Sequence, residues 1–245
     1  MAGLMLHALP DVAPGVELWW TDLAHDAAEI APVEAWLSPA EKARAARFGT
    51  DLLRRKYIAG RTSLRQVLGA TLGIEPAAVP IRRGARGRPE LAGTVAPHDF
   101  NISHTDGGAL IGVARRVPAD RRRIGVDVER EERLLGADRL ARKFLSPVEQ
   151  DSLRGLDADA RRRRFLRYWT CKEAMSKATG DGIGAPFGGL TIELEPAPRL
   201  VSGPPPYVPG AWQLHAPNVP HGFLATVALW QGDGAHDTRH GSPRR

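Results

Sequence analysis

Two acidic residues at alternate positions of an apolar run are the first candidates for chemistry. The segment "IGVDVER" (124–130) carries Asp127 and Glu129 among β-branched residues that favour a strand. A strand places alternate side chains on one face, so the two carboxylates lie roughly 6–7 Å apart on the same side. Like charges this close repel each other, and burying them unpaired is costly. Either this face is open to water, or a cation lies between the acids.

A third acid is predicted on a long helix that includes "RRRRFLRYWTCKEAMSKATG" (161–180). Glu173 and Lys177 are four positions apart, which puts them on one helix face, and Trp169 lies one turn earlier on that face. An ordinary surface ion pair has the same spacing. Taken alone, this pair therefore does not identify a site.

The three acids together predict a site for a hard cation. Carboxylate oxygens without a cluster of Cys and His side chains favour Mg²⁺ or Mn²⁺ over zinc. The chain has 34 Lys and Arg against 28 Asp and Glu, which gives a net charge of +6 and a pI near 10.0. Such a basic chain favours acidic partners, and together with the metal site this composition indicates chemistry on phosphates.

Two other classes of function also fit some of these features. A metal-dependent nuclease uses strand acids near a Glu and a Lys, but its Lys usually lies two positions from a strand acid, whereas Lys177 follows Glu173 on a helix. A non-catalytic RNA- or DNA-binding protein would explain the basic pI and the runs at 121–123 and 161–164. It would not explain the three acids, and no interleaved aromatic platform for stacking bases is present.

Helices and strands must hold these residues in place, and several of their boundaries are marked in the sequence. A strand is predicted at 16–20. A helix is predicted at 37–48, where Ser38 and Glu41 form a capping box, and a longer one at 51–72. Further strands are predicted at 100–104, 109–114, 211–215 and 222–230, with loops at 84–91 and 195–210.

The second part of the chain repeats features of the first. "LSPAEK" recurs 108 residues later as "LSPVEQ", with the same capping order. "KYIAGRTSLRQVLG" (56–69) also aligns without gaps against "RYWTCKEAMSKATG" (167–180), an offset of 111 that places Lys172 on Arg61. Two matches at nearly the same offset indicate a duplication. We therefore predict an α+β fold of two similar halves related by a pseudo-twofold axis, with a cleft between them.

Length and composition fit one large domain or two modest ones. We expect residues 1–120 and 121–230 to form the two halves, and the small polar residues 231–245 to be disordered. The single cysteine, Cys171, excludes an internal disulfide, which is typical of the cytoplasm. We expect neither a membrane span, which needs about 20 apolar residues, nor a secretion signal.

Three motifs together resemble the signatures of the 4′-phosphopantetheinyl transferases: "FNISH" (100–104), "IGVDVER" and "RYWTCKEAMSKATG". Each motif alone is weak, but GVDVE combined with WxxKEAxxK is specific, and the similarity extends over roughly residues 16–194. The resemblance is to the long, pseudodimeric type that activates polyketide and nonribosomal peptide synthetases.

The resemblance implies a reaction and its cofactors. The enzyme would transfer the phosphopantetheine arm of coenzyme A to a serine hydroxyl of an acyl or peptidyl carrier protein and release adenosine 3′,5′-bisphosphate. Asp127, Glu129 and Glu173 would hold Mg²⁺ against the diphosphate of coenzyme A. Glu173 or a metal-bound water would accept the serine proton, and Lys177 would offset charge on the phosphates or assist the leaving group.

The resemblance also implies donors for the 3′-phosphate and adenine of coenzyme A. His104 matches a family position that contacts the 3′-phosphate, and Ser103 would present its backbone to the adenine region. The other predicted donors are Arg44, Lys56, Arg61, Arg88 (in "GRP", where relatives often have GKP), Lys172 and Lys177. Carrier proteins are acidic, so the arginine runs are candidate docking residues. A monomer is expected, because the second half replaces the neighbouring subunit of shorter relatives.

Overall fold

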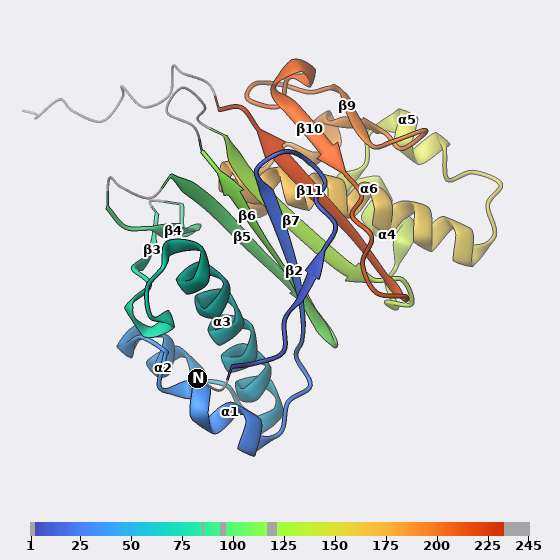
Figure 1. Ribbon diagram of the computed structural model, residues 1–245. Coiled ribbons are helices and arrows are strands. Elements are labelled where there is room, and N and C mark those ends of the chain that lie inside the picture. The colour runs from blue at the N-terminus through green and yellow to red at the C-terminus, as the bar shows by residue number, and fades with distance from the viewer. Residues whose placement is uncertain (1–2, 85, 94–96, 117–121, 233–245) are drawn as a thin grey trace, which may run out of the picture.

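The computed structural model of the chain describes residues 3–84, 86–93, 97–116 and 122–232. It has an α+β fold of two halves, each built from a long helix and an antiparallel sheet (Figure 1). The prediction of two similar α+β halves is confirmed. The predicted boundary at 120/121 and nearly all of the predicted disordered tail, 231–245, lie outside the described residues.

The first half is a four-stranded antiparallel sheet with helices on one face. Its strands are β1 (His7–Leu9), β2 (Val16–Asp22), β5 (His98–Thr105) and β6 (Gly108–Arg115), in the order β1-β2-β6-β5. The helices are α1 (Ala27–Glu34), α2 (Pro39–Ala45) and α3 (Asp51–Leu72), and a 3₁₀ turn at Pro76–Ala78 and the hairpin β3 (Ile81–Arg83) and β4 (Pro89–Leu91) follow α3. Apolar side chains of α3 pack against those of β5 and β6.

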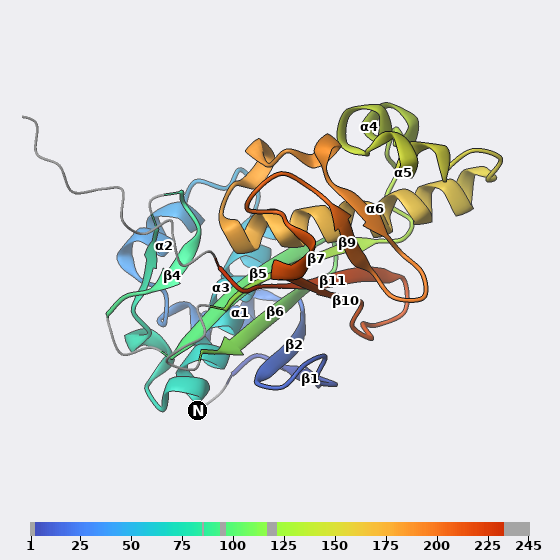
Figure 2. The same ribbon diagram turned by 90° about the horizontal axis from the view of Figure 1, so that it is seen from above.

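The second half repeats this plan with a three-stranded sheet. Its strands are β7 (Arg123–Arg130), β10 (Trp212–His215) and β11 (Phe223–Trp230), in the order β10-β11-β7. The other elements are α4 (Ala137–Phe144), α5 (Pro147–Asp151), α6 (Ala158–Thr179), the hairpin β8 (Thr191–Glu193) and β9 (Arg199–Ser202), and 3₁₀ turns at Gly182–Gly184, Phe187–Gly189 and Pro209–Ala211. Figure 2 shows α6 lying along β7 and β11. No helix within the described residues combines the length and apolar character needed to cross a membrane.

The predicted capping boxes are both present, but the predicted alignment of the two long helices is wrong. α3 and α6 each have 22 residues, and each ends at a left-handed glycine, Gly73 (φ 67°) or Gly180 (φ 84°). These ends coincide at an offset of 107 residues, one helical turn less than the predicted 111. A shift of four residues rotates a helix by only about 40°, so the incorrect alignment still matched similar helix faces.

With the correct register, a buried cation occupies the same place in both halves. Arg65 Nε of α3 lies 2.7 Å from Glu41 Oε2, and Lys172 Nζ of α6 lies 2.6 Å from Glu149 Oε2. Each glutamate also closes the capping box of the short helix before. Backbone carbonyls accept the remaining bonds, those of Pro76, Ala77 and Val79 from Arg65 and those of Phe144, Phe187 and Leu190 from Lys172. The counterpart of Lys172 is therefore Arg65 and not Arg61.

The two halves are joined by packing and by a row of polar side chains. Apolar residues of β2 and β6 pack against those of β7 and β11. Along the free edge of β7, three buried side chains of β5 accept backbone N–H bonds: Asp99 from Ile124 (2.8 Å), Asn101 from Val126 (3.2 Å) and Ser103 from Val128 (3.3 Å). An edge strand otherwise leaves such groups unpaired. This bridge between the halves fixes β7, the strand that carries two of the candidate acids, against β5.

Candidate active site

The two strand acids lie on the face of β7 that is turned toward α6, together with Gly125. Their exposed fractions are 5% for Asp127 and 8% for Glu129, so neither acid is on an open, solvated face. The helix passes so close that a Cβ added to Gly125 would lie 1.9 Å from the carbonyl oxygen of Ala174. Only glycine allows this approach. It brings the candidate residues of α6 up to the strand acids.

Asp127, Lys177 and Ser103 form one hydrogen-bonded group. Lys177 Nζ donates to Asp127 Oδ1 at 2.6 Å and to Ser103 Oγ at 2.8 Å. The Ser103 hydroxyl in turn donates to Asp127 Oδ1 at 2.9 Å. The group joins three segments, because Ser103 is on β5, Asp127 on β7 and Lys177 on α6. It brings together residues predicted separately as metal ligand, catalytic residue and coenzyme A contact.

Glu129 is bound by the indole N–H of Trp169 and by the guanidinium of Arg133. Trp169 Nε1 donates to Glu129 Oε1 at 3.2 Å, and Arg133 forms an ion pair with the same oxygen. The sequence spacing places Trp169 on the same helix face as Glu173 and Lys177. The structure shows that it also orients one of the acids, with its ring in contact with Phe144 of α4 (5.1 Å between ring centres).

The acids are close enough to affect one another electrostatically. Burial raises the pKa of Glu173 to about 7, and the negative charges of Asp127 and Glu129 add to this effect against the opposing charge of Lys177. Burial, followed by the charge of Asp127, also raises the pKa of Glu129. Two buried carboxylates and a half-buried one that repel each other are stabilised by a bound cation.

Whether the site fits a divalent metal ion depends on the donor atoms that remain available. Within the described residues, no three His, Cys, Asp or Glu side chains converge to enclose an ion. Asp127 is turned toward Lys177, and Glu129 toward Arg133. However, Asp127 Oδ2 is buried and has no hydrogen-bond partner among the residues that the structure describes. A hard cation would satisfy this oxygen and offset the repulsion among the acids, so the donor set fits Mg²⁺ or Mn²⁺.

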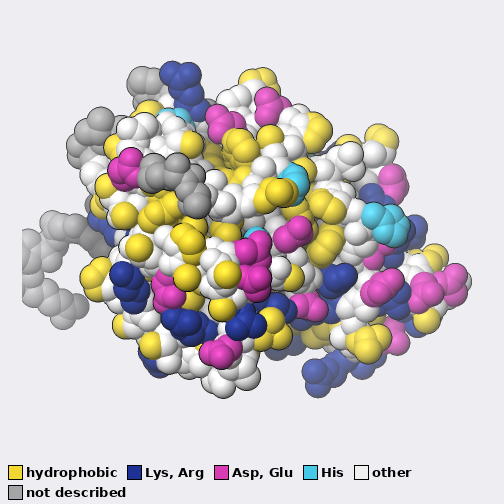
Figure 3. Space-filling view, turned by 60° about the horizontal axis from the view of Figure 1, so that its bottom comes forward, with side chains coloured by type: hydrophobic (Ala, Val, Ile, Leu, Met, Phe, Trp, Pro, Cys, Tyr) yellow, Lys and Arg dark blue, Asp and Glu magenta, His cyan; other side chains and the backbone are white. Residues whose placement is uncertain are grey.

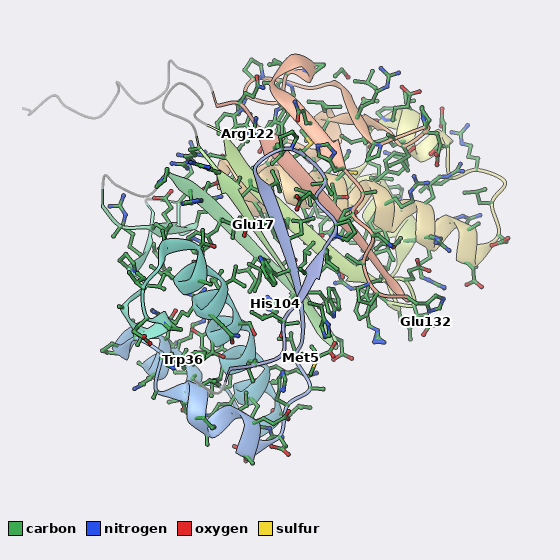
Figure 4. The ribbon with its side chains drawn as sticks, viewed as in Figure 1. Met5, Glu17, Trp36, His104, Arg122 and Glu132 are labelled. Atoms are coloured by element: carbon green, nitrogen blue, oxygen red, sulfur yellow. The ribbon has the colours of Figure 1, made fainter. Side chains whose placement is uncertain are left out.

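A group of basic residues lies on the other side of Ser103. Neighbouring residues of a strand point to opposite faces, so Ser103 faces the acids while His104 faces α3. Figure 4 shows His104 between α3 and β7, where the halves meet. Desolvation lowers the pKa of His104, and the positive charges of Lys177, Arg44 and Arg61 add to this effect against the opposing charge of Asp127.

The remaining predicted phosphate donors of α2 and α3 are exposed or half-buried. Arg44 is exposed, with its guanidinium carbon 5.7 Å from the ring centre of Tyr57. Arg61 Nη2 lies 2.6 Å from Glu41 Oε1, and Lys56 Nζ lies 2.6 Å from Asp106 Oδ1 at the β5–β6 turn. These side chains stay candidate ligands for the 3′-phosphate.

Two predicted coenzyme A contacts need correction. Arg88 is 6% exposed and forms a bidentate pair with Asp99 at 2.9 and 2.7 Å. Its other bonds go to backbone carbonyls of Lys177, Pro89, Phe100 and Ile124. A guanidinium has five N–H donors, so none is left for a phosphate. Lys172 has no exposed surface and is saturated by Glu149 and three carbonyls, so it too is an internal structural residue.

The sequence interpretation missed the bridging role of Asp99 and Asn101 and the contact of Arg133 with Glu129. A signal for the first was present, because Asn101 and Ser103 are polar residues at alternate positions of the strand predicted at 100–104, and Asp99 continues this alternation just before it. Such a pattern indicates one polar strand face. Arg133 lies four residues after Glu129, outside any predicted element, and carried no comparable signal.

Comparisons with known proteins agree with the three motifs. Residues 22–115 match the family model described as "4'-phosphopantetheinyl transferase, N-terminal", and residues 123–216 match the "4'-phosphopantetheinyl transferase superfamily". The chain is 39% identical over 203 residues to the 4'-phosphopantetheinyl transferase HetI of Nostoc sp., covering 81% of each chain.

More distant relatives are similar over a smaller share of their length. A phosphopantetheinyl transferase of Thraustochytrium sp. is 33% identical over 189 residues, which cover 69% of this chain and 62% of the relative. The L-aminoadipate-semialdehyde dehydrogenase-phosphopantetheinyl transferase of Xenopus laevis is 30% identical over 173 residues, or 66% and 55%. Matches over both halves, and the motif residues assembled around Asp127, confirm the resemblance: the chain belongs to the 4′-phosphopantetheinyl transferase superfamily and is an enzyme that activates carrier proteins with coenzyme A.

Proposed function

We propose that this enzyme transfers the phosphopantetheine arm of coenzyme A to a serine of apo acyl and peptidyl carrier proteins of polyketide and nonribosomal peptide synthetases. The reaction depends on Mg²⁺, or on Mn²⁺ in its place, and releases adenosine 3′,5′-bisphosphate. The observation that carries the proposal is the contact of Lys177 with Asp127 at 2.6 Å, beside a buried Asp127 oxygen without a partner.

The acids and Lys177 divide the work at the diphosphate. Asp127, Glu129 and Glu173 hold the metal, which when bound offsets the negative charge of the diphosphate. Lys177 places its ammonium beside Asp127 and offsets charge on the phosphates. Glu173 accepts the proton of the attacking serine hydroxyl. Without the metal, burial and the neighbouring acids raise the pKa of Glu173 to about 7. A bound cation would lower it and so favour the ionised carboxylate that accepts a proton.

The far end of coenzyme A is bound by the basic residues of the first half. We assign the 3′-phosphate to His104, Arg44, Arg61 and Lys56. The positive charges of Arg44 and Arg61 both lower the pKa of His104. The guanidinium groups can contact two phosphate oxygens at once, whereas Lys56 supplies a point charge. Coenzyme A thereby spans from α2 and α3 to the acids on β7 and α6.

The features that favoured a nucleic-acid-binding protein have another explanation. The four arginines 161–164 bond within the protein: Arg161 to Asp138, Arg162 to Asp159, Arg163 to Glu131 and Arg164 to the Ser152 carbonyl. Figure 3 shows Lys and Arg side chains interspersed with Asp and Glu over one face, without a continuous basic stripe. We therefore propose no nucleic-acid partner and no nuclease activity.

A panel of purified apo-carriers tests the proposed function. The enzyme is incubated with coenzyme A, Mg²⁺ and carriers of fatty-acid, polyketide and peptide pathways, and each carrier is weighed by mass spectrometry. We expect one phosphopantetheine on a serine of each polyketide and peptide carrier, and none when a chelator removes the metal. Unmodified carriers throughout, or degradation of added RNA or DNA, would contradict the proposal.

We propose the basic face of α4 as the docking surface for the carrier. Arg139 and Arg142 are exposed, lie on one side of the helix and form no ion pair within the described residues. α4 borders the site because Phe144, its last residue, contacts Trp169. Leu134, 93% exposed, lies just before this helix. A basic face with an apolar neighbour is complementary to an acidic carrier helix.

Charge reversal tests this surface. The double variant Arg139→Glu/Arg142→Glu should raise KM for the carrier about tenfold at low salt, with KM for coenzyme A unchanged. The matched control Arg154→Glu/Arg199→Glu changes the net charge equally at exposed positions elsewhere on the same half. Equal effects of both variants would show a general field effect and would contradict docking at α4.

We also expect a monomer in solution. Both halves contribute residues to the one site described here, Ser103 and His104 from the first and the acids and Lys177 from the second. Light scattering after size exclusion should therefore give the mass of one chain, 26.6 kDa. A defined dimer or trimer at working concentration would contradict this expectation.

A further inference from the structure

The Ser103 hydroxyl uses all of its hydrogen-bonding capacity inside the protein. Ser103 is 3% exposed, and its Oγ donates to Asp127 Oδ1 at 2.9 Å. It accepts from Lys177 Nζ at 2.8 Å and from the Val128 N–H at 3.3 Å. A hydroxyl has one donor and two acceptor positions. All three are occupied, so this side chain cannot bind coenzyme A without losing one of these bonds.

Within the described residues, these bonds leave one carboxylate oxygen of Asp127 and one N–H of Lys177 available to a ligand. Asp127 is fixed through Oδ1, while its buried Oδ2 has no partner in the described part of the chain. Lys177 directs two N–H bonds to Asp127 and Ser103, and an ammonium has three donors. The free carboxylate oxygen suits a cation and the third N–H suits a phosphate oxygen. Ser103 thus fixes which atom of each residue is available.

The connection also crosses between the halves of the molecule. Ser103 belongs to β5, whereas Asp127 and Val128 belong to β7 and Lys177 to α6. Rigid support from a second layer of hydrogen bonds is what holds metal ligands in a productive orientation. Asn101, two positions earlier, accepts a hydrogen bond from the Val126 N–H of β7 and, within the described residues, has no hydrogen bond to Asp127 or Lys177. It therefore offers a matched comparison.

We propose that Ser103 is a positioning residue, whose hydroxyl orients Asp127 for the metal ion and Lys177 for the diphosphate. The proposal rests on the proposed function and replaces the expectation that Ser103 acts through its backbone near the adenine. It assigns to the serine of "NISH" a role at the reacting end of coenzyme A. The neighbouring His104 stays a candidate for the opposite end.

The test compares Ser103→Ala, Ser103→Thr and Asn101→Ala with the wild type. Mn²⁺ binding is measured without coenzyme A, by electron paramagnetic resonance of the free ion. We expect Ser103→Ala to weaken Mn²⁺ binding and to lower kcat, each about 10- to 100-fold, with KM for coenzyme A changed less than about threefold. Ser103→Thr retains a hydroxyl on a strand and should recover most of both losses.

Asn101→Ala separates positioning from general damage to the contact between β5 and β7. We expect it to lower the thermal unfolding midpoint about as much as Ser103→Ala, while Mn²⁺ affinity and kcat stay within about threefold of the wild type. Similar losses of Mn²⁺ affinity in both variants would overturn the proposal. So would a Ser103→Ala enzyme with unchanged Mn²⁺ affinity, or one in which only KM for coenzyme A rises.

The Mn²⁺ measurement also keeps this proposal separate from the proposed function. If the wild type modifies no carrier, the proposed function fails, yet the comparison of Mn²⁺ affinities still decides whether Ser103 orients Asp127. Wild-type protein that does not bind Mn²⁺ at all would overturn the positioning role. A wild type that binds Mn²⁺ and modifies carriers, beside a Ser103→Ala variant impaired in both, supports both proposals.

Discussion

Replacing Glu173 by glutamine is expected to slow phosphopantetheine transfer by about 10²- to 10⁴-fold, the usual contribution of a general base. Glutamine has nearly the same shape but cannot accept the serine proton or supply a negative charge to the metal ion. The rate is measured by mass spectrometry of a carrier at saturating coenzyme A and Mg²⁺. Glu132→Gln, which changes an exposed acid near the end of β7, is the matched control and should keep the wild-type rate.

The same variant should be more stable than the wild type without metal above neutral pH. Burial raises the pKa of Glu173 from 4.5 to about 7, so the folded protein holds this proton more tightly than the unfolded chain. The contribution of Glu173 to the stability of the wild type therefore falls as pH rises from about 4.5 through 7, and glutamine removes this contribution. Thermal unfolding at pH 5 and pH 8 measures the difference. A variant that unfolds, or one that transfers at the wild-type rate, would contradict the role given to Glu173.

Replacing Lys172 by methionine is expected to destabilise the protein by about 3–5 kcal/mol, the usual effect of removing one partner of a buried ion pair. The change leaves Glu149, which is 1% exposed, as a buried charge without its cation. Three carbonyl groups also lose their donor. Denaturant unfolding at neutral pH measures the loss, and Lys42→Met, at an exposed position of α2, should change stability by no more than about 0.5 kcal/mol.

A double variant separates the buried charge from the loss of packing. Lys172→Met combined with Glu149→Gln removes both charges and should be more stable than Lys172→Met alone, because a neutral amide is easier to bury. A double variant that is less stable than Lys172→Met would contradict the view that the unpaired charge of Glu149 causes the loss of stability. If Lys172→Met unfolds like the wild type and only raises KM for coenzyme A, then Lys172 binds the ligand and is not a structural residue.

Much of the local structure could be predicted because its signals are local. The helix at 51–72 has the predicted bounds, and both short helices begin at the predicted capping serines, Ser38 and Ser146. The acids were correctly placed on one strand face, since alternation alone decides this. In contrast, α1 contains Pro32 and was not predicted, because a proline inside a helix hides its pattern.

Burial of charged residues could not be predicted, since it depends on the tertiary fold. In the sequence, Lys172 and Arg88 look like the exposed basic residues around them. Only the positions of Glu149 and Asp99 in space show that these cations are used internally. The alignment of the halves failed for a related reason: a one-turn shift preserves the faces of a helix, and the buried pair that distinguishes the two registers is not visible as a motif.

The central claim is that Asp127, Glu129 and Glu173 together hold the divalent ion that contacts the diphosphate. Anomalous scattering from crystals grown with coenzyme A and Mn²⁺ measures this directly, because the ion gives its own peak. The account predicts a single peak within bonding distance of oxygens from all three acids, with Asp127 contributing Oδ2. A peak elsewhere, or one outside bonding distance of an oxygen of any of the three acids, would contradict it.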